Sequence, residues 1–123
     1  MREIKTHETS LANQSIAISA DDWDEKYGNT SHAYAITFVD KEGRDAYCSI
    51  EFQRGPIKEV GVNGITNEAL LAILIDRLDG FQSGPFRCDE NDVAREHLLD
   101  AMAVLKLRTK ARLARGVEGT NVV

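Results

Sequence analysis

The clearest chemical feature of the sequence is a run of cations near its C-terminal end, with no acidic residue among them: Lys106, Arg108, Lys110, Arg112 and Arg115. Arg108 and Arg112 are four residues apart, so on a helix they share one face. Two forked guanidinium groups on one face can bind a pyrophosphate or a phosphodiester. Spacing alone favours a simpler interpretation, a solvated helix end whose cations complement the helix dipole.

Phe81 and Asn91 are the two other side chains that could contact a nucleotide. Phe81 stands between Gly80 and Gly84, and an aromatic ring at such a turn can stack on a base with about 1–3 kcal/mol. The commoner role for such a ring is to plug the open end of a helix pair. Asn91 can donate to and accept from a base edge or a ribose, and capping a helix explains it equally well.

A glycine-rich loop at residues 54–64 carries two cations, Arg54 and Lys58. Backbone amides in the loop, together with the helix N-terminus that follows it, could approach an anion. Because glycine is the default residue of tight turns, a plain strand-to-helix connection is the competing interpretation.

No pattern in the sequence predicts catalysis or a metal site. It has no phosphate-binding loop, no Gly-x-Ser-x-Gly elbow and no Cys-x-x-Cys, and His7, His32 and His97 lack the spacing of a zinc helix. Cys48 is expected on a buried strand face, and His97 on an apolar or interface side of its helix. Cys88, near a helix start, has no neighbouring base to make it a nucleophile. We therefore expect a binding protein without cofactor or metal, not an enzyme.

Composition supports the same conclusion. The chain has 123 residues, a net charge of −5 and 42% hydrophobic residues, which suits one globular domain. The negative charge argues against binding polymeric nucleic acid, which needs a broad positive face. No apolar run approaches the roughly 20 residues of a membrane helix, and the N-terminus does not resemble a signal peptide. We expect a protein of the cytoplasm.

The first half of the chain predicts an antiparallel sheet. Alternating apolar residues indicate strands at residues 15–20, 31–39 and 46–53, and a further short strand is expected at 57–60. Tyr34, Ile36 and Phe38 fall on one face of the second strand, and Cys48, Ile50 and Phe52 on one face of the third. That face is apolar and needs a cover.

The second half predicts two helices. Thr66 or Asn67 can cap a helix that ends near residues 80–82, with an apolar stripe at three- and four-residue spacing: Leu70, Leu71, Leu74, Ile75, Leu78 and Phe81. A second helix begins near residues 88–91 and is capped by Gly116. The expected fold is α+β in one domain, residues 1–123. Within it, residues 1–62 form the sheet part, 66–116 a helical hairpin that dimerises through its long second helix, and 117–123 a tail.

Two blocks of sequence resemble a known family. They read FQRGPIKEVGVNGITNE at residues 52–68 and LDGFQSGPF at 78–86, followed by Glu90, Asn91, Arg112 and RGVEGT at 115–120. They are similar to phage Thoeris anti-defence proteins of the cyclic ADP-ribose sponge family. The resemblance covers roughly residues 31–120.

The resemblance implies a sponge that sequesters glycocyclic ADP-ribose without cleaving it. Phe81 would stack on the adenine, Asn91 would contact the ligand, and Arg108 and Arg112 would bind the phosphates. Family members form dimers, some assemble further into hexamers as trimers of dimers, and some also bind cyclic trinucleotides of CBASS defence at a separate site. Arg54, Gly55 and Pro56 are the candidates for that second site.

Helix geometry adds a constraint of its own. Asn91 and Arg112 are 21 positions apart on one expected helix, which separates them by about 30 Å. No ligand the size of a mononucleotide spans that distance, so a site using all four residues needs two chains, paired with their long helices antiparallel. The alternative is a small module that binds nucleic acid or protein through the basic helix end.

Overall fold

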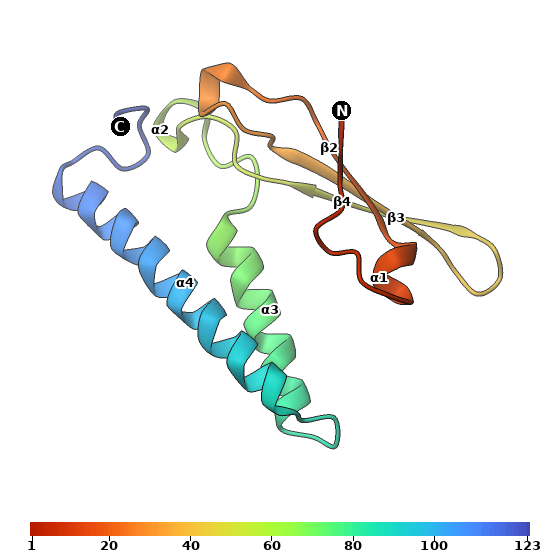
Figure 1. Cartoon of the computed structure of the whole chain (residues 1–123). Coiled ribbons are helices and arrows are strands. Elements are labelled where there is room, and N and C mark those ends of the chain that lie inside the picture. The colour runs from red at the N-terminus through yellow and green to blue at the C-terminus, as the bar shows by residue number, and fades with distance from the viewer. The chain divides into compact units, whose positions relative to one another are not determined.

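The computed structural model describes residues 1–123, which divide into two compact units (Figure 1). One unit comprises Met1–Gly55 and Val62–Ile65, and the other comprises Pro56–Gly61 and Thr66–Val123. The first is a four-stranded antiparallel sheet and the second is dominated by two long helices. The α+β class expected from the sequence is confirmed.

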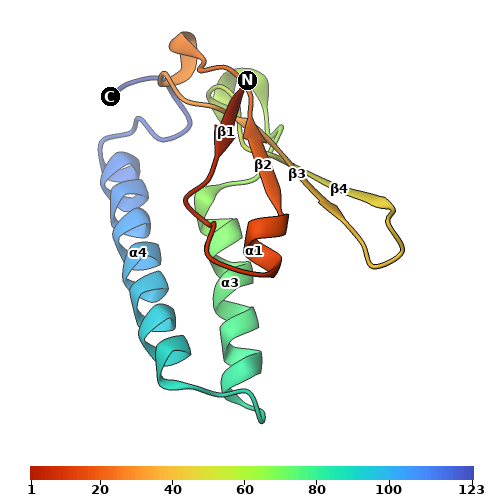
Figure 2. The ribbon, with the colours of Figure 1, turned by 45° about the vertical axis from the view of Figure 1, so that its right-hand side comes forward.

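The sheet has its strands in sequence order, β1 (Arg2–Ile4), β2 (Ala17–Ala20), β3 (Ala33–Val39) and β4 (Asp45–Glu51). Figure 2 shows β1 and β2 side by side and β3 running into β4 through a hairpin turn. Tyr34 pairs with Ile50 and Ile36 pairs with Cys48. Directly paired residues of antiparallel strands point to the same face, so the predicted apolar face is formed.

Four details of the sheet unit differ from the prediction. The strand expected from residue 15 begins at Ala17, because Ala12–Ser15 forms a helical turn, α1. The three-residue strand β1 was not predicted. Phe52 lies past the end of β4 and bridges to Ile65 instead. Cys48 is exposed rather than buried, because it lies on β4, a strand at the sheet's edge.

Gly64 is required where the loop returns to the sheet. A Cβ at this position would lie 2.4 Å from the backbone carbon of Phe52, so any other residue would push the two segments apart. The close approach lets Ile65 donate to the carbonyl of Glu51 at 2.9 Å while Gln53 donates to the carbonyl of Ile65 at 2.9 Å.

In the helical unit, α3 (Asn67–Gln82) and α4 (Asp89–Ala114) lie side by side as a hairpin (Figures 1 and 2). The Thr66 hydroxyl caps α3 by accepting from the Ala69 amide at 3.1 Å, as predicted. Leu71, Ile75 and Leu78 are half-buried. The segment Ile57–Val60 is a helical turn, α2, not the expected strand, because it starts after Pro56 and ends at Gly61 with φ +73°.

Gly116 ends α4, as predicted. Its φ is +70°, and the Val117 amide donates to the Arg112 carbonyl while the Gly116 amide donates to the Leu113 carbonyl. This pair of bonds is the Schellman arrangement, which favours glycine at the left-handed position. None of the helices combines the length and apolar content needed to traverse a bilayer.

Candidate ligand-binding site

Phe81 presents an open aromatic ring near the end of α3. The residue is 40% exposed, and the Arg77 guanidinium lies over its ring at 5.5 Å from the centroid. The half-buried row of α3 continues through Leu78 and Gln82 instead. This exposure argues against the role of a plug, and it leaves the ring able to stack on a planar ligand.

The turn beside this ring is held by the Gln82 side chain. Its carbonyl oxygen accepts from the Cys88 amide at 3.1 Å, and its amide nitrogen donates to the Cys88 carbonyl and to Asp92 Oδ1, each at 2.8 Å. The ion pair between Arg95 and Asp79 joins the two helices again one turn further on. Gln82 therefore fixes the turn that presents Phe81, although nothing in the sequence pattern singled it out.

Asn91 is half-buried in the first turn of α4. The residue at the cap position is Cys88, whose side chain makes no capping bond, so capping does not explain Asn91. Its amide makes no hydrogen bond within the chain. It can therefore donate to and accept from a ligand.

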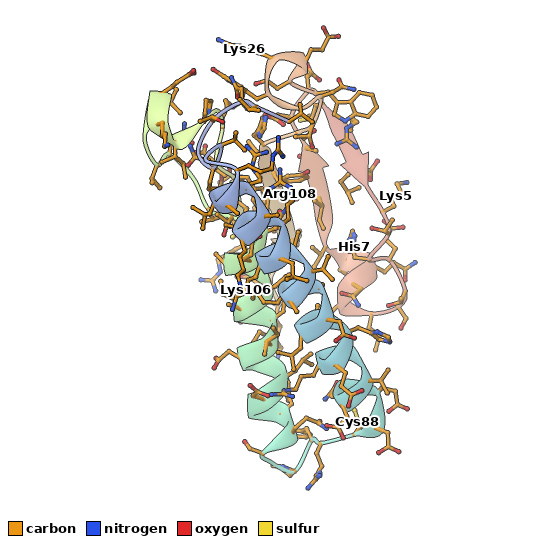
Figure 3. The ribbon with its side chains drawn as sticks, turned by 90° about the vertical axis from the view of Figure 1, so that its left-hand side faces the viewer. Lys5, His7, Lys26, Cys88, Lys106 and Arg108 are labelled. Atoms are coloured by element: carbon orange, nitrogen blue, oxygen red, sulfur yellow. The ribbon has the colours of Figure 1, made fainter.

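At the other end of α4, Arg108 is exposed and has no ion-pair partner (Figure 3). Lys106, labelled beside it, and Lys110 are also exposed and unpaired. Cys88 marks the opposite end of the same helix. Arg108 thus offers an uncompensated guanidinium, as a phosphate contact requires.

Arg112 has a different environment, although it lies one turn after Arg108. Its side chain is only 12% exposed, and Nε donates to Glu118 Oε2 at 3.1 Å. Its terminal nitrogens donate to three backbone carbonyls, those of Val117 at 3.0 Å, Thr120 at 3.2 Å and Val122 at 2.7 Å. The expected tail, residues 117–123, is therefore a folded segment organised around Arg112.

This C-terminal segment also contacts α2. The Lys58 amide donates to the Gly119 carbonyl at 3.1 Å, and a Cβ on Gly119 would lie 3.3 Å from the Lys58 side chain. Between them is a cleft of about 390 Å³, lined by Ile57, Lys58, Leu113, Gly116, Glu118 and Gly119. Sequence reasoning missed this packing, because its contacts form only after the chain reverses at Gly116.

One chain does not bring the four predicted ligand residues together. Asn91 and Arg112 lie on the same uninterrupted helix, α4, at the separation of about 30 Å expected from helical rise. Phe81 and Asn91 lie at the turn end, and Arg108 and Arg112 lie at the far end. The separation that the sequence predicted is therefore present.

Arg54, a candidate for the second site, is ion-paired within the sheet unit. Its guanidinium donates to Asp21 Oδ2 at 2.7 Å and to Asp24 Oδ2 at 3.3 Å. Burial alone would raise the pKa of Asp21, but backbone hydrogen bonds from His32 and Ala33 and the Arg54 guanidinium outweigh it and lower that pKa. The cation of Arg54 is therefore largely neutralised by its own unit.

The surroundings of Arg54 form a cleft of about 270 Å³, lined by His32, Ala33, Glu51, Phe52, Arg54 and Asn63. Asn63 binds the Arg54 backbone on both sides, accepting from its amide and donating to its carbonyl, each at 2.8 Å. Gly55 accepts from the Gln53 side chain at 3.1 Å, and Pro56 is buried. The arrangement explains the loop's shape, and its binding role stays a prediction.

The remaining candidate residues form no reactive cluster. His97 is exposed, so of the two expected positions, core or interface, the core of the single chain is excluded, and Cys88 is exposed as well. No group of three or more His, Cys, Asp or Glu side chains is placed to hold a metal ion.

A sheet unit and a helical hairpin, with an exposed ring at the turn and unpaired cations at the far end, make this an α+β helical-hairpin protein. The model of the Acb2/Tad1 hairpin domain matches residues 44–110, more than half of the chain. The chain therefore belongs to the Acb2/Tad1 hairpin family, which confirms the resemblance stated from the sequence.

One relative is Thoeris anti-defense 1 of Bacillus phage SBSphiJ7. It is 42% identical over 95 residues, which are 77% of this chain and 66% of the relative. The match thus spans just under two thirds of the relative's length.

Proposed function

We propose that this chain is a phage anti-defence protein that binds glycocyclic ADP-ribose in the cytoplasm of the infected bacterium and withholds it from Thoeris defence. Its similarity to Thoeris anti-defense 1 supports Thoeris as the defence system that it blocks. The main support for the site is that the exposed ring of Phe81 and the unpaired guanidinium of Arg108 lie at opposite ends of the hairpin. Binding without cleavage is the proposed mode, because the site residues include no nucleophile with an adjacent base.

The exposed side of α4 supports a two-chain site. The half-buried residues of α4 repeat at alternating four- and three-residue spacing: Asn91, Arg95, Leu98, Met102, Leu105, Thr109 and Arg112. An exposed row repeats with the same spacing: Val93, His97, Asp100, Val104, Leu107 and Ala111. Val104 is 63% and Leu107 is 64% exposed. A row with this heptad period is suited to packing against another helix.

We propose that a second copy of the chain packs antiparallel on this exposed row. The turn end of one subunit, with Phe81 and Asn91, then lies at the end of the partner subunit's α4 that carries Arg108, and the two-fold axis generates two equal sites. The adenine stacks on Phe81, Asn91 contacts the ligand, and Arg108 binds a phosphate. Arg112 joins the site by exchanging Glu118 for a phosphate oxygen.

A second site for cyclic trinucleotides, built around Arg54, Gly55 and Pro56 in a hexamer of three dimers, is proposed on the resemblance alone. Arg54 could bind a phosphate there by exchanging Asp24, its more distant partner at 3.3 Å. Titration with a cyclic trinucleotide, before and after saturation with glycocyclic ADP-ribose, tests whether such a site is separate.

The experiment that tests sequestration is release of intact ligand. The protein is incubated with glycocyclic ADP-ribose, freed of unbound ligand by filtration, and heat-denatured. Recovery of unchanged ligand from the denatured protein supports a sponge. Recovery of a cleavage product would identify an enzyme. If the denatured protein releases neither ligand nor product, it does not bind glycocyclic ADP-ribose.

A further inference from the structure

Arg77 and Phe81 are four residues apart on α3, so they share a face of the helix. The Arg77 Cζ lies 5.5 Å from the centroid of the Phe81 ring. Arg77 makes no ion pair, and the nearby carboxylate of Asp79 is already paired with Arg95. The guanidinium is therefore held near the ring by the ring itself, through a cation–π contact.

This contact makes the two faces of the ring unequal. Arg77 covers one face, while the residue as a whole remains 40% exposed. The backbone beside the ring is immobilised by the Gln82 bonds to Cys88 and Asp92. The ring is thus restrained at both its backbone and its side chain, with one face left for a ligand.

We propose that Arg77 is a positioning residue for base recognition: it holds the Phe81 ring so that the adenine of the ligand stacks on the uncovered face. This inference rests on the proposed function, because it assumes that Phe81 is the stacking residue. A ring already fixed in its bound orientation loses less rotamer freedom on binding. Exposed cation–π contacts are weak, so the expected effect is about a two- to fivefold change in Kd.

The test is calorimetric titration of the full-length protein with glycocyclic ADP-ribose. Arg77→Ala and Arg77→Gln are expected to weaken binding about two- to fivefold, and Arg77→Lys to restore part of the loss. Arg87→Ala is the matched control, because Arg87 is an exposed arginine near the same turn that makes no ring contact or ion pair. It is expected to bind like the wild type.

Two further readouts separate positioning from a direct phosphate contact. Because Arg77 acts through the ring, Arg77→Ala is expected to leave the salt dependence of binding unchanged. In a Phe81→Leu background it is expected to have no further effect. The positioning role would be overturned if Arg77→Ala reduced the dependence of Kd on salt concentration. It would also be overturned if Arg77→Ala weakened binding as much in the Phe81→Leu background as in the wild type.

The outcomes also distinguish this inference from the proposed function. If Phe81→Ala weakens binding but Arg77→Ala matches Arg87→Ala, the positioning role is wrong and the proposed site stands. If Phe81→Ala leaves binding unchanged, the stacking site is wrong and the role of Arg77 is wrong with it.

Discussion

Arg108 and Arg112 lie one turn apart on α4, yet only Arg108 is free. Arg112 donates to Glu118 and to three backbone carbonyls of the C-terminal segment, whereas Arg108 is exposed and unpaired. The two arginines of the predicted phosphate-binding pair therefore have different environments in the free chain. Arg108 is available to an anion, and Arg112 stabilises the chain's own end.

Replacing Arg108 with alanine is expected to weaken binding of glycocyclic ADP-ribose without affecting the fold. Losing a charge-assisted contact to phosphate costs about 1.5–3 kcal/mol, which is roughly a ten- to hundredfold rise in Kd. Lys110→Ala is the control, since it removes another exposed, unpaired cation from the same helix end on a different face. Calorimetry that finds equal losses for both variants would indicate general charge attraction instead of a specific contact.

Replacing Arg112 with alanine is expected to release residues 117–123 and to destabilise the helical unit. The three backbone carbonyls, two of them half-buried, and Glu118 lose their common donor, at a cost of about 1–3 kcal/mol. Hydrogen exchange of the Val117 and Thr120 amides measures the release directly. Arg115→Ala is the control, because Arg115 makes one exposed bond, to the Val123 carbonyl. Unchanged exchange in Arg112→Ala would contradict the structural role of Arg112.

Replacing Leu107 with aspartate is expected to break the proposed dimer while each subunit stays folded. Leu107 lies in the exposed row of α4, where a buried, unpaired carboxylate would oppose association. Sedimentation at micromolar concentration measures the mass. Val62→Asp, at an exposed loop position, should leave the mass unchanged. A wild-type mass near 13.7 kDa would rule out the dimer altogether.

The lowered pKa of Asp21 makes the stability of the sheet unit depend on pH. An unfolded aspartate titrates near pH 3.9, and the folded carboxyl titrates below it. The contribution is therefore fully present above about pH 4 and is lost as pH falls through the folded-state pKa. Urea denaturation at several pH values measures the free energy of unfolding. Asp21→Asn should reduce its fall at acid pH, while Asp45→Asn, at an exposed position, should leave that fall unchanged.

Both helices could be predicted because their start, period and stop are local signals. Thr66 caps α3 and Gly116 ends α4 at the predicted places. The strand predicted at residues 57–60 was wrong. The apolar residues at its ends suggested a strand, whereas the segment Ile57–Val60 is a single helical turn between Pro56 and Gly61. Strand β1 has only three residues and exists through its pairing with β2, which no local pattern reveals.

The candidate site was predictable in its residue types but not in their environments. Phe81 and Asn91 were predicted as candidates from their place near a turn, and the separation along α4 followed from helical rise alone. The state of Arg112 could not be predicted, because its partners are mostly backbone carbonyls brought back by the reversal at Gly116. Such contacts depend on the path of the chain and not on the sequence of the residues that supply them.

Whether each proposed binding site is built from two chains can be measured by calorimetry on a forced heterodimer. One subunit carries Phe81→Ala and the other carries Arg108→Ala. In a two-chain site, both lesions fall on one site and the other site is intact. One ligand is expected to bind per heterodimer at nearly wild-type affinity, and loss of tight binding at both sites would show that each site lies within one chain.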